Sequence, residues 1–420
     1  MNAVELGPVL PEAQTQSPVD LFLIFAGANI VATTMVTGAA LAPAFSTRTA
    51  HGLIGLGSVA GAALVALLVP LGPRFGVPSV IAARAALGVG GAALLAALLY
   101  VTNFAWIALN NVIAASACAH VLGGPESERA WAVGLGILAT AVVSAGPRAV
   151  GLADRVAVPL MLGVAVLMTV RAFGLTAGAV SPPVAGGLSW VRGLDVVIGY
   201  QVSWILMFAD YSRYCRSETR SMSAVFLALV STSVWFMALG FLAARAAGSP
   251  DPGAMIQALG LGTAGAILLA LATVTTNFVN VYLSALAWKS LVPKAGEQAS
   301  VWTIGLVGAG LSLLSRSWLD RYGDFMVLLG GLLVPIGGIL LAHFFVLRVP
   351  TDVATLYEVT GRRGVGGGFS GAALAAWALG AAAYYTGTAI GGTVPALVVS
   401  AAAYLGLSRI SRSREASAAR

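Results

Sequence analysis

Runs of about 20 apolar residues recur along this chain of 420 residues, separated by short polar connections. A helix needs about 20 mostly apolar residues to cross the hydrocarbon core of a bilayer. The pattern predicts twelve such helices, over residues 20–45, 52–72, 87–118, 130–147, 151–170, 193–212, 222–247, 259–288, 300–316, 324–347, 369–387 and 389–408. The predicted fold class is an all-α polytopic membrane protein.

Composition strengthens this prediction. Hydrophobic residues make up 58% of the chain and charged residues only 9%, whereas charged residues make up about 25% of an ordinary soluble domain. The mean hydropathy is +0.90. So few charged side chains cannot cover the surface of a soluble protein of this size. A soluble enzyme, a nucleic-acid-binding protein and a disordered chain are therefore excluded.

The basic residues are scattered singly between the apolar runs, and they predict orientation. If the N-terminus is cytoplasmic, 16 of the 23 Lys and Arg residues fall on the cytoplasmic side. We therefore expect a multi-pass protein of the cytoplasmic (inner) membrane with both termini inside. The net charge of +7 is interpreted as topology signals and contacts with anionic lipids. Polar residues 1–19 and the basic tail 409–420 are expected to be disordered.

Residues typical of catalytic or metal centres do not cluster in the sequence. The two cysteines, Cys118 and Cys215, cannot build a disulfide framework, and His51, His120 and His343 are far apart along the chain. Paired carboxylates and a nucleophile–base pair are also missing from the predicted spans. An intramembrane enzyme or a channel stays an alternative, although neither catalytic groups nor a repeated filter motif is evident. No enzymatic activity is expected.

The first predicted span has a polar centre that begins at Gly27 and Asn29 and continues through several threonines. A segment rich in Gly, Asn and Thr can unwind within the membrane and free backbone carbonyl groups to bind a cation. The alternative is an intact helix whose threonine hydroxyls bond to their own backbone.

The third span carries Asn103, Trp106 and Asn110 at i, i+3 and i+7, which places them along one stripe of a helix. Two amides around an indole suit a flat, hydrogen-bonding heterocycle. Amide bonds between helices and an interfacial tryptophan are the alternatives.

The sixth span has Gln201, Ser203 and Trp204 in its middle, where an amide can hydrogen-bond to the edge of a ligand. Asp210 and Arg213 lie at i and i+3 near its end. This spacing predicts a structural or gating ion pair.

The eighth span is the most polar. It contains Thr273, Thr275, Thr276, Asn277, Asn280 and Ser284. Threonine hydroxyls are hard oxygen ligands suited to Na⁺, and the two amides can hydrogen-bond to a substrate. Polar side chains within a span must face a cavity or a partner, because hydrocarbon offers them none.

Several segments together resemble a known family. GANIVATTMVTGAALAP, NFAWIALNN, SWILMFADYSRY, TVTTNFVNVY and GGLLVPIGGILLAHFF occur in the order expected for the nucleobase–cation symporter-1 family. They look like its purine–cytosine permease branch, and in particular its hydroxymethylpyrimidine permeases. The resemblance implies a LeuT-type fold, with two inverted five-helix repeats within residues 20–348 and two additional helices within 369–408. It also implies alternating access around a site in mid-membrane.

The resemblance implies a cation site as well. Its ligands would be backbone carbonyls near Gly27 and Val31, the carbonyl of Ala272, and the hydroxyls of Thr275 and Thr276. The implied coupling ion is Na⁺, with H⁺ as the alternative.

For the substrate, the resemblance implies stacking on Trp106 and hydrogen bonds from Asn103, Ser203 and Asn277. Where relatives place an aromatic residue on the sixth span, the chain is aligned with Gln201, and Trp204 is a candidate replacement. The full set of candidate substrate contacts is Asn29, Asn103, Trp106, Asn110, Gln201, Ser203, Trp204, Asn277 and Asn280.

The expected function is cation-coupled import of a neutral, planar, nucleobase-like ring such as hydroxymethylpyrimidine, cytosine or a purine. Phe278 follows Asn277 where cytosine permeases place an acidic residue, which argues against cytosine itself. A hydantoin or allantoin symporter is the alternative. A monomer in the lipid bilayer is expected to suffice.

Overall fold

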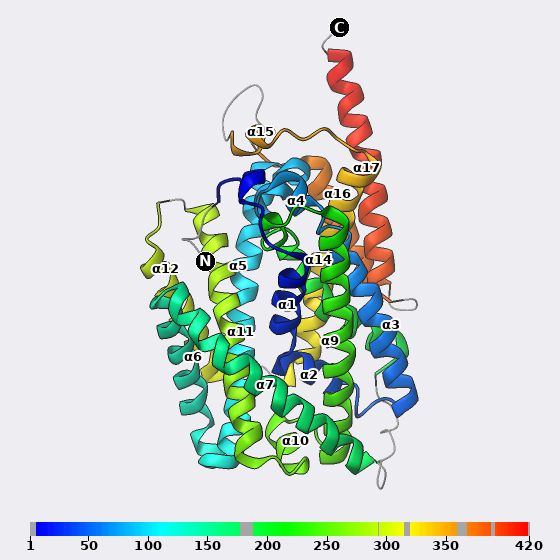
Figure 1. Cartoon of the computed structure of the whole chain (residues 1–420). Coiled ribbons are helices and arrows are strands. Elements are labelled where there is room, and N and C mark those ends of the chain that lie inside the picture. Colours follow the sequence, from blue (N-terminus) through cyan, green and yellow to red (C-terminus); the bar gives the residue numbers. More distant parts are fainter. Residues whose placement is uncertain are drawn as a thin grey trace.

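The chain forms a bundle of helices (Figure 1). The computed structural model describes residues 6–176, 188–292, 294–314, 320–358, 368–387 and 391–418, and no strand occurs among them. The longer helices are α1 (Pro18–Asn29), α2 (Ala32–Ala39), α3 (Thr47–Ala66), α5 (Ser79–Leu122), α6 (Glu128–Ser144), α7 (Pro147–Thr176), α8 (Trp190–Val202), α9 (Glu218–Ala247), α11 (Gly262–Leu291), α12 (Glu297–Leu311), α14 (Tyr322–Leu341), α16 (Gly371–Thr386) and α17 (Thr393–Ala418). Shorter elements are η1 (Pro11–Ala13), α4 (Leu71–Phe75), η2 (Pro125–Ser127), η3 (Ser203–Met207), η4 (Ser212–Tyr214), α10 (Pro252–Ala258), η5 (Ser312–Leu314), η6 (Ala342–Val346) and α15 (Val353–Tyr357).

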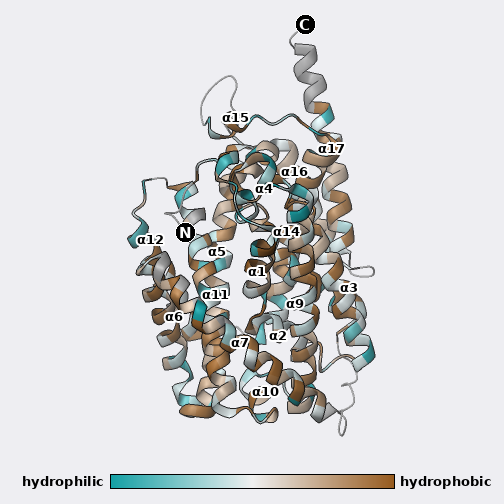
Figure 2. Ribbon diagram, in the orientation of Figure 1, coloured by the Kyte–Doolittle hydropathy of each residue, from teal (hydrophilic) through white to brown (hydrophobic). Residues whose placement is uncertain are grey.

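Each of the twelve predicted spans coincides with a helix of the described part. Seven of these helices are long and apolar enough to cross a membrane, and the bent pair α1–α2 makes an eighth. The other four spans correspond to α6, α8, α12 and α16, which have 17, 13, 15 and 16 residues. Residues 315, 316, 389 and 390, at the ends of two predicted spans, lie outside the described residues. Hydrophobic residues cover much of the flanks of the bundle (Figure 2), as a lipid-facing surface requires.

The first span is broken, as its polar centre predicts. Helix α1 ends at Asn29, α2 begins at Ala32, and their axes differ in direction by 57°. Val31 lies between them with an extended backbone (φ −138°, ψ 164°). The sixth span is irregular too, because α8 passes into the 3₁₀ turn η3 at Ser203. Both irregular segments lie deep in the bundle, where freed carbonyl groups are shielded from lipid.

Two glycines allow the second half of the broken span to pack closely on α9. A Cβ atom at Gly38 would overlap with the backbone carbonyl oxygen of Met237, and one at Gly240 would overlap with that of Met35. The backbones of α2 and α9 therefore approach each other within a distance that only glycine permits.

Residues 6–17 and 409–418, parts of the two chain ends for which disorder is expected, are described by the structure. Residues 6–17 run along one end of the bundle, where the Val9 amide donates to the carbonyl of Gly76 (2.8 Å) and the Gln14 amide donates to Pro73 and Arg213 carbonyls (3.0 and 3.2 Å). Backbone and side-chain hydrogen bonds thus give this segment a defined position. At the other terminus, α17 continues to Ala418, because the Ser/Arg/Ala sequence contains no helix breaker.

Asp195 of α8 ties the start of the last helix to the core. Its carboxylate accepts hydrogen bonds from the backbone amides of Gly392 and Thr393 (2.7 and 3.2 Å) and from the Thr393 hydroxyl (2.8 Å). The buried carboxylate therefore caps the start of α17.

Candidate functional site

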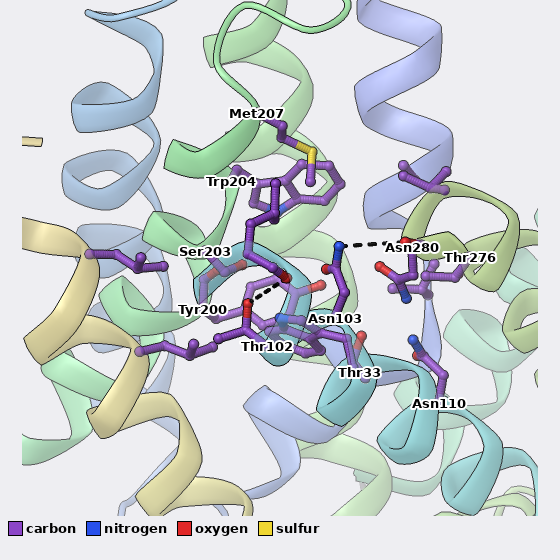
Figure 3. Close-up of a pocket in the computed structure, with 17 residues that line it drawn as sticks. Thr33, Thr102, Asn103, Asn110, Tyr200, Ser203, Trp204, Met207, Thr276 and Asn280 are labelled. Carbon is purple, nitrogen blue, oxygen red and sulfur yellow. Dashed lines mark hydrogen bonds between the residues drawn. The ribbon is translucent and has the colours of Figure 1, made fainter. Parts of the chain in front are cut away.

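A cavity of about 50 Å³ lies between the two irregular segments and helices α5, α11 and α14 (Figure 3). It is lined by Ala28, Val31, Thr33, Leu99, Thr102, Asn103, Trp106, Asn110, Tyr200, Ser203, Trp204, Met207, Thr276, Val279, Asn280, Leu329 and Leu333. None of these lining residues carries a charge. The cavity combines aromatic rings, amides and hydroxyl groups, which suits a neutral polar ligand with a flat ring.

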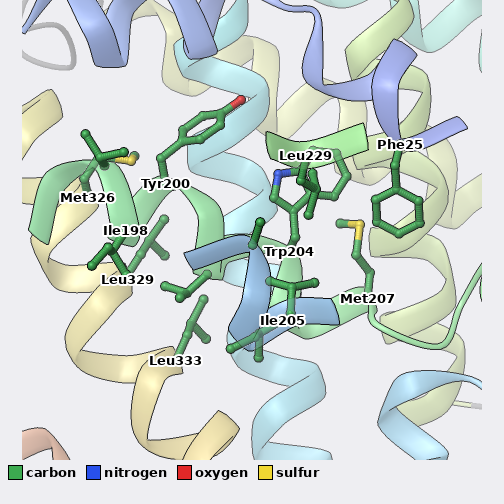
Figure 4. Packing of buried hydrophobic residues seen from close by; sticks show 14 of the residues in the cluster. Phe25, Ile198, Tyr200, Trp204, Ile205, Met207, Leu229, Met326, Leu329 and Leu333 are labelled. Atoms are coloured by element: carbon green, nitrogen blue, oxygen red, sulfur yellow. The ribbon is translucent and has the colours of Figure 1, made fainter. Parts of the chain in front are cut away.

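Aromatic side chains from three elements, α5, α8 and η3, line the cavity. The rings of Trp106 and Tyr200 lie edge to face, with centroids 6.0 Å apart and an interplanar angle of 84°. Trp204 packs against Phe25 of α1 with centroids 5.5 Å apart. Apolar residues of α8, η3 and α14 pack around Tyr200 and Trp204 and hold the two rings in place (Figure 4). A planar ligand between α5 and α8 would contact the faces or edges of these rings.

Three asparagines supply the amides of the cavity. Asn103 and Asn110 come from α5 and Asn280 comes from α11, and each side chain is largely buried. The Asn103 amide nitrogen donates to the backbone carbonyl of Asn280 (3.4 Å), which ties α5 to α11 at the edge of the cavity.

The structure brings together six of the nine residues that the sequence predicts as substrate contacts. The residues that line the cavity are Asn103, Trp106, Asn110, Ser203, Trp204 and Asn280. Tyr200 was not among the substrate contacts predicted from the sequence, although it directly precedes Gln201. With Trp204, it is one of the two aromatic residues of the segment GYQVSW. Its aromatic ring in the polar segment GYQVSW was the signal that could have identified it.

Gln201, a predicted substrate contact, does not line the cavity. Its side chain is fully buried and packs toward α3, where a Cβ atom at Gly61 would contact its Cβ and Cγ atoms. Successive residues of a helix point about 100° apart, and therefore Tyr200 faces the cavity when Gln201 faces α3.

Asn29 and Asn277 also lie outside the cavity lining. The Asn29 amide nitrogen donates to the hydroxyls of Thr232 and Ser233 on α9 (2.8 and 2.7 Å) and fastens the end of α1 to that helix. The Asn277 amide nitrogen donates to Asn111 on α5 (2.8 Å). Both amide nitrogens are thus bound to side chains of neighbouring helices.

The predicted cation ligands lie on two elements: Gly27 and Val31 belong to the broken first span, and Ala272, Thr275 and Thr276 belong to α11. Val31 and Thr276 line the cavity, whereas Gly27, Ala272 and Thr275 do not. The Thr276 hydroxyl donates to the Ala272 carbonyl (2.6 Å), so its lone pairs stay available to a cation. The Thr275 hydroxyl donates to the carbonyls of Leu271 and Ala272 (3.0 and 3.1 Å) in the same way.

Asp210 and Arg213, the pair that the i, i+3 spacing predicts, each make hydrogen bonds to other residues. The Asp210 carboxylate accepts a hydrogen bond from the Ser79 hydroxyl (2.6 Å). The Arg213 guanidinium donates to the Gly7 carbonyl (3.4 Å) and the Tyr214 hydroxyl (2.9 Å). Arg213 therefore helps to hold the N-terminal segment over the end of the bundle.

Solved structures of other proteins share the fold of this chain. The fold is similar to that of Mhp1, a nucleobase–cation symporter-1 family transporter, in a closed conformation with bromovinylhydantoin bound (TM-score 0.81, 18% identity, covering 97% of this chain and 95% of that one). It is also similar to inward-facing Mhp1 (TM-score 0.83, 19% identity, covering 98% and 96%). A Na⁺-coupled sialic acid symporter has a more distant likeness (TM-score 0.56, 13% identity, covering 97% and 98%). The chain thus has a LeuT-type fold.

The family follows from the sequence comparisons. A family model described as "Permease for cytosine/purines, uracil, thiamine, allantoin" matches residues 8–406. The chain belongs to this family of permeases, the purine–cytosine permease branch of the nucleobase–cation symporter-1 proteins. It is 26% identical to a Bacillus subtilis (strain 168) protein assigned as a purine-cytosine permease, over 82% of this chain and 79% of that protein. It is 24% identical to the cytosine permease of Escherichia coli (strain K12), over 83% and 82%.

Proposed function

We propose that the protein imports a neutral, planar, nucleobase-like heterocycle by cation symport and alternating access, with Na⁺ as the coupling ion. The candidate substrates are pyrimidines such as hydroxymethylpyrimidine or cytosine, and purines. The observation that carries the proposal is the uncharged cavity, in which Trp106, Tyr200 and Trp204 accompany the amides of Asn103, Asn110 and Asn280. A charged substrate would find no counter-ion among these lining residues.

Substrate accumulation in proteoliposomes tests the proposal directly. Purified protein should concentrate radiolabelled cytosine, adenine or hydroxymethylpyrimidine above the outside concentration when an inward Na⁺ gradient is imposed. A channel would only equilibrate the ligand, and an enzyme would change it chemically.

Trp106→Ala should weaken binding about tenfold or more, because the ligand loses its ring contact. Trp302→Ala is the matched control, since Trp302 is partly exposed on α12 and does not line the cavity.

The proposed Na⁺ position is between the break in the first span and α11. The break frees carbonyl groups near Val31, and Thr276 on α11 provides a hydroxyl lone pair beside the same cavity. Carbonyl and hydroxyl oxygens are suitable ligands for a hard monovalent cation. A cation held by both elements would fasten the broken span to α11 and favour the conformation that binds substrate, and this coupling must be reciprocal.

Removal of the proposed cation ligand should separate Na⁺ binding from substrate binding. We expect Thr276→Ala to raise the Na⁺ concentration for half-maximal uptake about tenfold or more, whereas Thr276→Ser should preserve it. Thr386→Ala is the control, because Thr386 makes the same type of bond to the carbonyl four residues earlier, on α16 away from the cavity. Equal uptake with and without Na⁺ would contradict Na⁺ coupling, and a proton gradient would then be tested as the driving force.

We further propose that both termini are cytoplasmic and that a monomer is the transporting unit. The excess of Lys and Arg in the connections on that side supports this orientation.

A further inference from the structure

We propose that a second pocket, at the end of the bundle that carries α4 and α15, binds the phosphate group of an anionic phospholipid. The pocket has a volume of about 540 Å³, and ligand pockets typically have about 300–1,000 Å³. It shares no lining residue with the central cavity, so the inference goes beyond the proposed transport function. The lining residues are Arg74, Phe75, Phe344, Phe345, Arg348, Val349, Pro350 and Thr351.

The pocket lies at the level where two apolar spans end. One candidate span covers Thr47–Phe75 and another covers Tyr322–Val346, and residues from the last turns of both line the pocket. Val346 is 61% exposed, so hydrophobic surface continues beside the pocket, whereas lining residues 348–351 lie beyond the second span. The boundary between hydrocarbon and headgroups is therefore expected at this pocket, where a bilayer places its phosphate groups.

Three phenylalanines form the apolar part of the pocket. Phe344 and Phe345 are neighbours on the π-helical turn η6, and both line the pocket. Phe344 packs on Phe75 at the end of α4, with ring centroids 5.6 Å apart. Single π-helical turns often occur at functional sites. An apolar wall beside a polar opening suits the glycerol and acyl part of a lipid, which a soluble phosphate compound lacks.

Two arginines from different segments converge on Phe345. The guanidinium carbon of Arg74 lies 5.9 Å from the centroid of the Phe345 ring, and Nε of Arg348 donates to the Phe345 carbonyl (3.3 Å). Glu218 holds Arg74, because its carboxylate accepts from Nε (3.1 Å) and Nη2 (2.6 Å). Within the described part of the chain, Nη1 of Arg74 and both terminal nitrogens of Arg348 therefore stay available to a ligand.

The charges of the pocket favour an anion. Its lining residues include no carboxylate, and although Glu218 balances the charge of Arg74, that of Arg348 is left over. Asp352 follows the pocket in sequence but does not line it, and its carboxylate accepts from the Ala354 amide (3.1 Å). Guanidinium groups match phosphate oxygens in geometry and charge. Basic pockets between helices on the cytoplasmic side, the side proposed for these connections, bind the headgroups of anionic lipids.

The backbone of Arg348 adds an independent observation. Its φ of +49° is in the left-handed region, and among the described residues other than glycine it alone has a positive φ. Glycine adopts this conformation without strain, and a long side chain does not. Strained backbone of this kind is concentrated at binding and active sites. A guanidinium that is needed at the pocket explains why arginine occupies a position that suits glycine.

Thermal unfolding of the full-length protein in detergent tests the inference, with dioleoyl-phosphatidylglycerol or dioleoyl-phosphatidylcholine titrated into the micelles. The two lipids have the same acyl chains, but only the first has a net charge. We expect phosphatidylglycerol to stabilise the wild-type protein with an apparent affinity about fivefold or more above that of phosphatidylcholine. Arg348→Gln should lower the affinity for phosphatidylglycerol about fivefold, whereas Arg348→Lys should keep most of it because the charge stays.

Arg220→Gln is the matched control, because Arg220 is exposed two residues after Glu218 and does not line the pocket. Its affinity for phosphatidylglycerol should equal that of the wild type. Thr351→Trp leaves the charge unchanged but would fill the pocket with an indole, and it should also lower the affinity.

Three results would overturn the inference. The first is equal affinity of the wild type for the two lipids, and the second is an equal loss in Arg348→Gln and Arg220→Gln, which would indicate a general surface charge. The third is stabilisation by free glycerol phosphate as strong as that by the lipid, which would identify a soluble phosphate compound as the ligand. These measurements do not involve transport, so the proposed function stands or falls separately.

Discussion

A Tyr200→Ala variant should lose substrate accumulation almost completely, whereas Gln201→Ala should still transport. The Tyr200 ring lines the cavity and meets Trp106 edge to face, while the Gln201 side chain packs against α3. Removal of one ring from an aromatic pair around a ligand removes both apolar contact area and ring–ring interaction, about 0.5–1.5 kcal/mol beyond burial alone. The measurement is Na⁺-driven uptake into proteoliposomes at equal protein content.

Tyr200→Phe is the conservative control for this prediction. It keeps the ring and loses only the hydrogen bond to Thr34, so uptake should stay within a few fold of wild type. The result that would contradict the assignment is the opposite pattern, with uptake lost in Gln201→Ala and retained in Tyr200→Ala. That pattern would mean that α8 is rotated by about one residue in the transporting protein.

A second large effect is expected at the close contact between α2 and α9. Gly240→Ala should lower the melting temperature by several degrees, because the new Cβ atom would overlap with the Met35 carbonyl oxygen. Forcing extra atoms into a packed interior costs about 1–3 kcal/mol, and sometimes more when the neighbour is backbone. Gly38→Ala should have a similar effect through the Met237 carbonyl. Thermal unfolding in detergent, followed by loss of the monodisperse species, measures both.

Gly134→Ala provides the matched control, because no atom lies within 4 Å of the position that its Cβ would take. In a helix interior, alanine is favoured over glycine by about 1 kcal/mol, so this variant should be as stable as wild type or slightly more stable. A Gly240→Ala protein as stable as the Gly134→Ala protein would show that α2 and α9 do not pack as described.

The same contact bears on the proposed transport cycle. Because α2 is locked to α9 while α1 is fastened to α9 through Asn29, both halves of the broken span are expected to move with α9 as one body. The cavity lies between this body and α5 with α11, so a relative displacement of the two groups would open or close it. Substrate and cation at the boundary would then favour one arrangement over the other.

Much of the site was predictable from spacing alone. Asn103, Trp106 and Asn110 share one stripe of a helix by their separation, and the structure places all three on the cavity wall. The break in the first span was also predictable, because Gly, Asn and Thr in a membrane helix weaken its backbone and can replace its hydrogen bonds. Both features depend on residues that are close in sequence.

The sequence by itself located the apolar helices, since a helix satisfies the backbone hydrogen bonds of an apolar segment in lipid. Only the tertiary structure decided which face of each helix meets the cavity. From the sequence alone, Tyr200 and Gln201 are equally plausible cavity residues. The packing of α8 against α3 buries Gln201 there and leaves Tyr200 to line the cavity. Likewise Asn277 and Asn280 both suit a ligand, but Asn111, far away in sequence, takes the amide of Asn277. Hydrogen bonds between helices that are far apart in sequence depend on how the helices pack. The spacing of residues within one helix does not determine that packing.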